Sequence, residues 1–226
     1  MNKTLTTGII GAGRIASGFG TPEDDLPLSL AHAITLAGEL QLGGFFDISE
    51  ESAQEAEKKW SCPASPRDRD CWLAEPWDVI CVATPDEQHA DDLHDILSSP
   101  RPPRAVLIEK PLCTDPDKAE QLLKRAKNMG VAVQVNYPRR WQPDLLKLTQ
   151  RIQSGEFGKL LRYSICCSGG LLHNGSHAVD LLASWLPNDF LTDYTYNDAG
   201  MLAGANGDSV EIIMRDSVQH DCYLWE

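Results

Sequence analysis

Residues 4–16 read TLTTGIIGAGRIA, and this stretch decides the fold. A short apolar run, typical of a buried strand, leads into a turn with the pattern GxGxxA. Gly11 would permit the tight turn, Gly13 would let the backbone approach a pyrophosphate, and Ala16 would allow a helix to pack closely on the strand. The start of that helix would offer free N–H groups to phosphate oxygens. The alternative is that the two glycines only make a tight turn.

Four further apolar runs follow the glycine turn, at residues 40–47, 77–84, 105–110 and 131–137. Near-continuous apolar runs are typical of strands buried on both faces of a parallel sheet. Helix signals separate them. Ser49 precedes a helical stretch, Thr84 starts the capping-box sequence TPDE, and Asp115 and Gly130 bracket a third helix. This alternation predicts an α/β domain with a doubly wound sheet.

The pattern changes after residue 137, where strands and helices no longer alternate. Leu145, Leu148 and Ile152 share one helix face, and Gly155 would end that helix. A second helix is predicted at 176–186, and strands are predicted at 160–168, 193–197, 209–214 and 218–225. We therefore expect a Rossmann-type domain over 1–137 and a smaller α+β domain over 138–226.

Asp47 ends the second predicted strand and indicates which dinucleotide would bind. A carboxylate at this position can hold both ribose hydroxyls of NAD and would repel the 2′-phosphate of NADP. Alternatively, Asp47 only caps the next helix. The spacing from the glycine turn to Asp47 is longer than usual, and residues 18–29, rich in proline and acids, look like an inserted surface loop.

Lys110 ends the fourth predicted strand, beside Glu109. Ligands in doubly wound folds bind beyond the carboxyl ends of the strands, and a partly desolvated lysine there suits proton transfer. The alternative is an ordinary surface lysine.

The stretch GGLLHNGSHAVD, residues 169–180, joins a strand to a helix. His177 and Asp180 would share one helix face, so the carboxylate could orient the imidazole. His173 and Asn174 could take part in the chemistry or only cap the helix. These histidines and Asp180 lack a further ligand that would favour zinc, so we expect no metal.

Composition limits the partners of the chain. The formal net charge of −13 makes nucleic acid an unexpected partner, because an acidic surface repels phosphate backbones. No apolar stretch approaches the roughly 18 residues needed to cross a membrane. The seven cysteines show no CxxC spacing, and no signal peptide is evident, so we expect reduced thiols in a cytoplasmic protein.

Together these stretches resemble the Gfo/Idh/MocA family, named after glucose-fructose oxidoreductase and inositol dehydrogenase. The resemblance is carried, in order, by GIIGAGRIA, HAITLAGELQLGGFFD, VATPDEQHADDL, EKPL, NYPRRWQP, IQSGEFGKL and GGLLHNGSHAVDLLASWL. It covers almost the whole chain. The EKP motif and the GSHAVDLL helix are its most specific parts.

The resemblance implies an NAD(H)-dependent oxidoreductase that moves a hydride to or from a secondary alcohol of a sugar, cyclitol or nucleotide sugar. Lys110 would hydrogen-bond the reacting hydroxyl and His177 would exchange its proton. Many members carry aspartate four residues before that histidine, where this chain has His173, followed by Asn174. The residues expected to bind the cofactor, NAD, are Gly11, Gly13, Arg14, Ile15, Asp47, Ala83, Thr84, Pro85, His89, Glu109, Lys110 and Asn136. Arg139 or Arg140 would bind an anionic substrate group or form a salt bridge.

Family members are longer and complete a mostly antiparallel C-terminal sheet that commonly forms the subunit interface. We therefore expect a truncated C-terminal domain and a possible homo-oligomer. The alternatives are a catalytically inactive dinucleotide-binding or regulatory relative and, more remotely, a structural module that binds no nucleotide.

Overall fold

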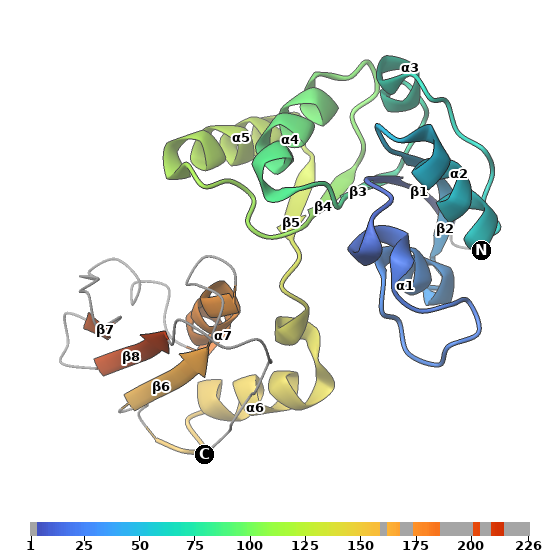
Figure 1. Ribbon diagram of the computed structural model, residues 1–226. Coiled ribbons are helices and arrows are strands. Elements are labelled where there is room, and N and C mark those ends of the chain that lie inside the picture. The colour runs from blue at the N-terminus through green and yellow to red at the C-terminus, as the bar shows by residue number, and fades with distance from the viewer. Residues whose placement is uncertain (1–3, 159–161, 168–173, 186–200, 204–208, 215–226) are drawn as a thin grey trace. The chain divides into compact units, whose positions relative to one another are not determined.

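The computed structural model describes residues 4–158, 162–167, 174–185, 201–203 and 209–214. The chain divides into two compact units, Met1–Asn136 and Tyr137–Glu226 (Figure 1). Each unit is described by itself below.

A five-stranded parallel sheet forms the centre of the described part of the first unit, with the strand order β2-β1-β3-β4-β5. Its strands are β1 (Leu5–Ile10), β2 (Leu40–Phe46), β3 (Val79–Val82), β4 (Ala105–Ile108) and β5 (Ala132–Val135). All five lie within the predicted apolar runs, which confirms the Rossmann-like α/β fold. After β1 the chain goes first to β2 on one side and then to β3 on the other, so the order reverses at β1.

The helices cover both faces of this sheet because successive strand residues point to opposite faces. Ile9 and Phe45 pack in one buried cluster, whereas Ile10 and Phe46 pack in another. Helices α1 (Leu30–Leu36) and α2 (Glu50–Lys59) contribute to the first cluster. Helices α3 (Arg69–Leu73), α4 (His89–Ser98) and α5 (Pro116–Met129) contribute to the second.

The first helix after the glycine turn is unusually short. It is the π-helix η1 (Arg14–Gly18), and the next helix, α1, begins only at Leu30. Residues 21–28 between them are exposed, which confirms the predicted surface loop. The carbonyl of Ser17 accepts hydrogen bonds from Lys59 Nζ at 2.9 Å and Trp60 Nε1 at 3.0 Å. Side chains at the end of α2 thus satisfy a terminal carbonyl of η1, as a longer helix would do internally.

Three of the four predicted helix signals are confirmed. Ser49 and Asp115 cap α2 and α5, and Gly130 ends α5 with a left-handed φ of 73°. The capping role of Thr84 is wrong. The 3-10 helix η2 (Asp86–Gln88) follows Pro85 without a side-chain cap, and Thr84 Oγ1 instead donates to Asp92 Oδ2 at 2.5 Å.

The second unit begins with the 3-10 helix η3 (Pro138–Trp141) and helix α6 (Pro143–Gln153). Its described strands are β6 (Arg162–Cys167), β7 (Met201–Ala203) and β8 (Ser209–Met214), and helix α7 (Ser176–Trp185) lies between β6 and β7 in sequence. Within the described residues the sheet order is β6-β8-β7, with β6 parallel and β7 antiparallel to β8. The strands expected at 193–197 and 218–225 lie outside the described residues.

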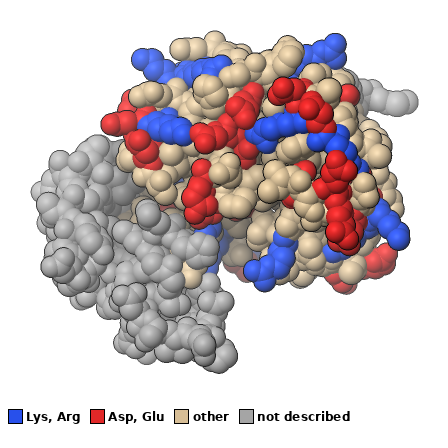
Figure 2. Space-filling model, turned by 45° about the horizontal axis from the view of Figure 1, so that its top comes forward, with Lys and Arg blue, Asp and Glu red and all other residues tan. Residues whose placement is uncertain are grey.

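Charged side chains of both signs are interspersed on the face of the molecule drawn in Figure 2. This mixture fits a chain whose net negative charge is spread over its surface. Among the described helices, none has the length and the apolar composition that crossing a bilayer requires.

Ser65 covers the outer edge of β2, which is an edge strand of the sheet. Its hydroxyl accepts from the Phe45 N–H at 3.1 Å and donates to the Phe45 carbonyl at 2.6 Å. Its own N–H donates at 2.9 Å to Glu57, which Arg67 also holds. A side chain and a loop therefore pair backbone groups that an edge strand would leave open.

We expect Ser65→Ala to lower the free energy of unfolding by about 1–3 kcal/mol, because it leaves the Phe45 N–H without its partner. Urea unfolding followed by circular dichroism measures the change. The matched control is Ser154→Ala, which removes an exposed hydroxyl that donates to the Arg151 carbonyl of the preceding helical turn and should stay within about 0.5 kcal/mol of the unmodified chain. Equal effects of both substitutions would show that Ser65 does not stabilise the edge.

Candidate functional site

A pocket of about 930 Å³ lies at the carboxyl ends of β1, β2 and β3, where the strand order reverses. This is where doubly wound folds bind ligands, and the volume is within the range of small-molecule and cofactor sites. The pocket is lined by Ile10, Gly11, Gly13, Arg14, Ile15, Phe46, Asp47, Ile48, Arg69, Ala83, Thr84, Pro85, Gln88 and Asp92. Eight of these were predicted to bind the cofactor: Gly11, Gly13, Arg14, Ile15, Asp47, Ala83, Thr84 and Pro85.

The two glycines of the turn lie in different surroundings. Gly11 has a φ of +91°, and a Cβ there would lie 2.6 Å from the carbonyl oxygen of Ala83. A Cβ on Gly13 would meet no atom within 4 Å, so this part of the turn is open. The first N–H groups of η1 have no partner within their own helix. The turn therefore fits a pyrophosphate: Gly11 brings β1 and β3 together, and Gly13 leaves room for phosphate oxygens.

Asp47 is half-buried and holds the glycine turn against the end of β2. One carboxylate oxygen accepts from the Ala12 N–H at 2.7 Å and the other from the Ser49 N–H at 2.9 Å. Each carboxylate oxygen accepts more than one hydrogen bond, so both keep capacity for ribose hydroxyls. The carboxylate thus lies in the pocket next to the turn, as a ribose-binding acid must.

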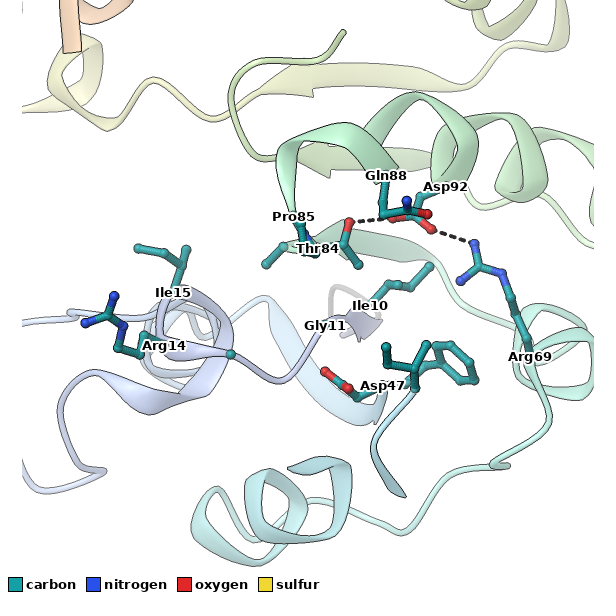
Figure 3. A pocket seen from close by; sticks show the side chains of 14 residues that line it. Ile10, Gly11, Arg14, Ile15, Asp47, Arg69, Thr84, Pro85, Gln88 and Asp92 are labelled. Atoms are coloured by element: carbon teal, nitrogen blue, oxygen red, sulfur yellow. Dashed lines mark hydrogen bonds and ion pairs between the residues drawn. The ribbon is translucent and has the colours of Figure 1, made fainter. Parts of the chain in front are cut away.

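The two ends of the pocket differ in character (Figure 3). Arg14 and Ile15 lie at one end, Arg69 and Asp92 lie at the other, and Asp47 lies between them. Sequence analysis missed the second end. Residues 69, 88 and 92 belong to three helical elements, α3, η2 and α4, and no local pattern marks them as ligands of one pocket.

The predicted cofactor contact of His89 stays a prediction, and His89 is not among the residues that line this pocket. His89 is fully buried at the start of α4. Its Nε2 lies 2.8 Å from the carbonyl oxygen of Thr84, and its Nδ1 lies 2.7 Å from that of Pro111. The ring therefore connects the pocket wall after β3 to the segment that follows Lys110.

Lys110 and its neighbours lie at the ends of β4 and β5. Glu109 and Lys110 directly follow β4 and are half-buried, and the Lys110–Pro111 peptide is cis. Asn136 Nδ2 donates to Glu109 Oε1 at 2.5 Å and thereby joins the two strand ends. Glu109 and Asn136 were predicted to bind the cofactor. The structure shows their side chains bonded to each other, and their contact with the cofactor stays a prediction.

His177 lies in the first turn of α7, in the second unit. Its ring meets the Tyr137 ring edge-on, with the centroids 5.5 Å apart. Burial raises the pKa of the Tyr137 hydroxyl, and a hydrogen bond with Ser176 opposes this effect only in part. Asn174 lies just before this helix, and His173 lies outside the described residues.

Asp180 forms an ion pair, and its predicted role in orienting His177 stays a prediction. Its carboxylate forms an ion pair with the Arg140 guanidinium, in which Arg140 Nε donates to Oδ2 at 3.0 Å. The hydrogen bonds that Arg140 donates to Asp180 raise the pKa of Arg140. Of the two roles expected for Arg140, the structure shows the salt bridge. No group of three His, Cys, Asp or Glu suited to a metal occurs among the described residues.

Known proteins with similar sequences include inositol dehydrogenases. Inositol 2-dehydrogenase of Mycolicibacterium smegmatis is 39% identical over 85 residues, which are 37% of this chain and 24% of that protein. Inositol 2-dehydrogenase of Corynebacterium glutamicum is 25% identical over 213 residues, which cover 94% of this chain and 58% of that protein. The chain thus spans at most about three fifths of the length of these two relatives.

Solved structures support the same fold. The WlbA dehydrogenase from Bordetella pertussis, in complex with NADH and UDP-GlcNAcA, has a TM-score of 0.76 at 19% identity and covers 98% of this chain and 70% of that one. A putative myo-inositol dehydrogenase from Sinorhizobium meliloti has a TM-score of 0.74 at 20% identity and covers 95% and 70%.

A family model described as "Oxidoreductase family, NAD-binding Rossmann fold" matches residues 5–137, more than half of the chain. These residues contain the whole parallel sheet and every residue that lines the pocket. The protein therefore belongs to the Gfo/Idh/MocA oxidoreductase family, and its first unit is an NAD-binding Rossmann fold of that family.

Proposed function

We propose that this protein transfers a hydride between NAD(H) and a secondary alcohol of a sugar, cyclitol or nucleotide sugar. The observation that carries the proposal is the pocket at the reversal of strand order, with Gly13 open to it and the Asp47 carboxylate beside the turn. In this arrangement Gly13 and the N–H groups of η1 bind the pyrophosphate. Asp47 binds the ribose hydroxyls and disfavours a 2′-phosphate.

The substrate class is inferred from relatives. Both sequence relatives named above are inositol 2-dehydrogenases, and the WlbA structure contains a nucleotide sugar. Inositols and sugars share adjacent secondary hydroxyls on a six-membered ring. We infer a polyhydroxylated ring as the substrate, oxidised at one carbinol carbon.

NAD+, when bound, supplies the acceptor for the hydride of that carbon. Lys110 directly follows β4, in the sheet that contains the pocket, and holds the reacting hydroxyl by donating a hydrogen bond to its oxygen. His177 takes the hydroxyl proton as the carbonyl forms, with His173 and Asn174 beside it in sequence. Glu109 and Asn136 act through Lys110 by fixing the strand ends around it. Homo-oligomerisation and a cytoplasmic location stay predictions.

Lys110→Ala should reduce kcat/KM by about 100-fold or more, because general acid–base groups contribute on that scale. The measurement is NADH formation from NAD+ over a panel of inositols, sugars and nucleotide sugars. NADH affinity, measured by nicotinamide fluorescence, should fall far less than turnover.

The matched control is Lys124→Ala, at an exposed position on α5, which should keep normal turnover. Normal turnover in Lys110→Ala would remove Lys110 from the reaction. An unmodified chain that binds NADH but oxidises no member of the panel would favour the non-catalytic alternative.

Asp47→Ser should weaken NADH binding by about 10- to 100-fold, as expected for losing hydrogen bonds to a charged group. NADPH binding should weaken less or improve, because the repulsion of the 2′-phosphate is lost. Titrations of each dinucleotide give the two dissociation constants. Glu55→Ser, on the exposed face of α2, changes the net charge equally and serves as the control. An unchanged ratio of the two constants would show that Asp47 does not contact the ribose.

A further inference from the structure

An arginine held by two acids forms one wall of the dinucleotide pocket. Arg69 begins α3, and its guanidinium lies over the Phe46 ring, 5.5 Å from the centroid. Nη2 lies 2.6 Å from Asp92 Oδ1 and 3.1 Å from Asp95 Oδ2, and Nε donates to Asp95 at 3.3 Å. Arg69, Phe46 and Asp92 all line the pocket (Figure 3).

Asp92 fixes the position of this arginine from the side of the sheet. Its side chain is only 5% exposed. One oxygen binds Arg69, and the other accepts from Thr84 Oγ1 at the end of β3. A buried carboxylate needs such partners, and a buried cation–anion pair resists solvent screening far better than an exposed pair. Arg69 is therefore anchored to the same strand end that forms the pocket wall.

The charges at this end of the pocket sum to one negative charge. Arg69 contributes one positive charge, and Asp92 and Asp95 contribute one negative charge each. Two of the three guanidinium nitrogens are engaged by the carboxylates. Nη1 has no hydrogen-bond partner in the described part of the chain. Arg69 thus lines the pocket, but the carboxylates of Asp92 and Asp95 neutralise its positive charge.

Arginine is the residue that commonly accommodates the 2′-phosphate of NADP, through bidentate hydrogen bonds. Arg69 lies over Phe46, the residue directly before Asp47, so it is on the side of the pocket where the adenosine ribose would extend. Without its ion pairs to Asp92 and Asp95, Arg69 could bind that phosphate. Together with the two carboxylates, it forms a part of the pocket wall whose net charge is negative.

We propose that Asp92 and Asp95 are specificity-determining residues, which hold Arg69 so that the pocket accepts NAD and rejects NADP. This inference rests on the proposed cofactor site and adds a second source of selectivity to Asp47. It differs from a purely structural tie between α3 and α4, since such a tie would not change the relative affinity for the two dinucleotides.

The test compares dissociation constants of NADH and NADPH for Asp92→Asn/Asp95→Asn with those of the unmodified chain. Asparagine keeps the size of each side chain and an oxygen that can accept from Thr84. The ratio Kd(NADPH)/Kd(NADH) should fall by about tenfold or more, the scale of one strong charge–charge interaction. Adding Arg69→Gln should restore the ratio, because the gain requires the released arginine.

Asp95→Asn alone is the second variant, because this side chain is 47% exposed and its substitution should not disturb folding. It should lower the ratio in the same direction by a smaller factor, and the decrease should shrink at high salt. An unchanged ratio in both variants would overturn the inference, as would a gain that persists without Arg69. If the unmodified chain bound neither dinucleotide, the cofactor site itself would be wrong. Normal NADH binding without the change in ratio would refute this inference alone.

Discussion

The close approach of two backbones at Gly11 is the constraint on which the rest of the site depends. The left-handed φ of Gly11 and the 2.6 Å distance from its would-be Cβ to the Ala83 carbonyl leave room for no side chain. This contact lets the chain leave β1 beside the end of β3. The pocket lies at these two strand ends and that of β2, so the residue that permits the turn also lines the site.

Two hydrogen bonds also hold the glycine turn against the end of β2. The Gly11 N–H donates to the Phe46 carbonyl at 2.7 Å, and the Ala12 N–H donates to Asp47 at 2.7 Å. The ends of β1, β2 and β3 are thus linked through two consecutive backbone positions, Gly11 and Ala12. The short helix η1 needs this support, because a single turn of helix has little stability of its own. Lys59 and Trp60 supply the remaining partners at its far end.

Local signals in the sequence were sufficient to predict the sheet and most of the helix ends. Each strand is an apolar run with a turn after it, and Ser49, Asp115 and Gly130 act only on backbone groups within a few residues. The glycine turn could be interpreted for the same reason. Eight predicted cofactor ligands line one pocket because the ends of parallel strands meet at one edge of the sheet.

Local sequence patterns did not predict the contacts between side chains that belong to different secondary-structure elements. Thr84 was predicted to cap a helix, but Asp92 competes for its hydroxyl. Arg140 pairs with Asp180, forty residues later in the chain, and no local pattern identifies Asp180 as its partner. No role was predicted for Arg69 or Asp92, although together they form one wall of the site.

The charge of the whole chain is a poor guide to the charge of its site. A net charge of −13 would repel an anionic dinucleotide if it acted as a whole, yet screening at physiological salt limits each exposed charge to roughly 8 Å. Near the turn, a dinucleotide in the proposed site would meet N–H groups and Arg14, which favour its phosphates. Near β2 it would meet Asp47 and the pair of Asp92 with Arg69, which leave little positive charge for a further phosphate. One pocket can therefore attract two phosphates and repel a third, because each group acts only over its own short range.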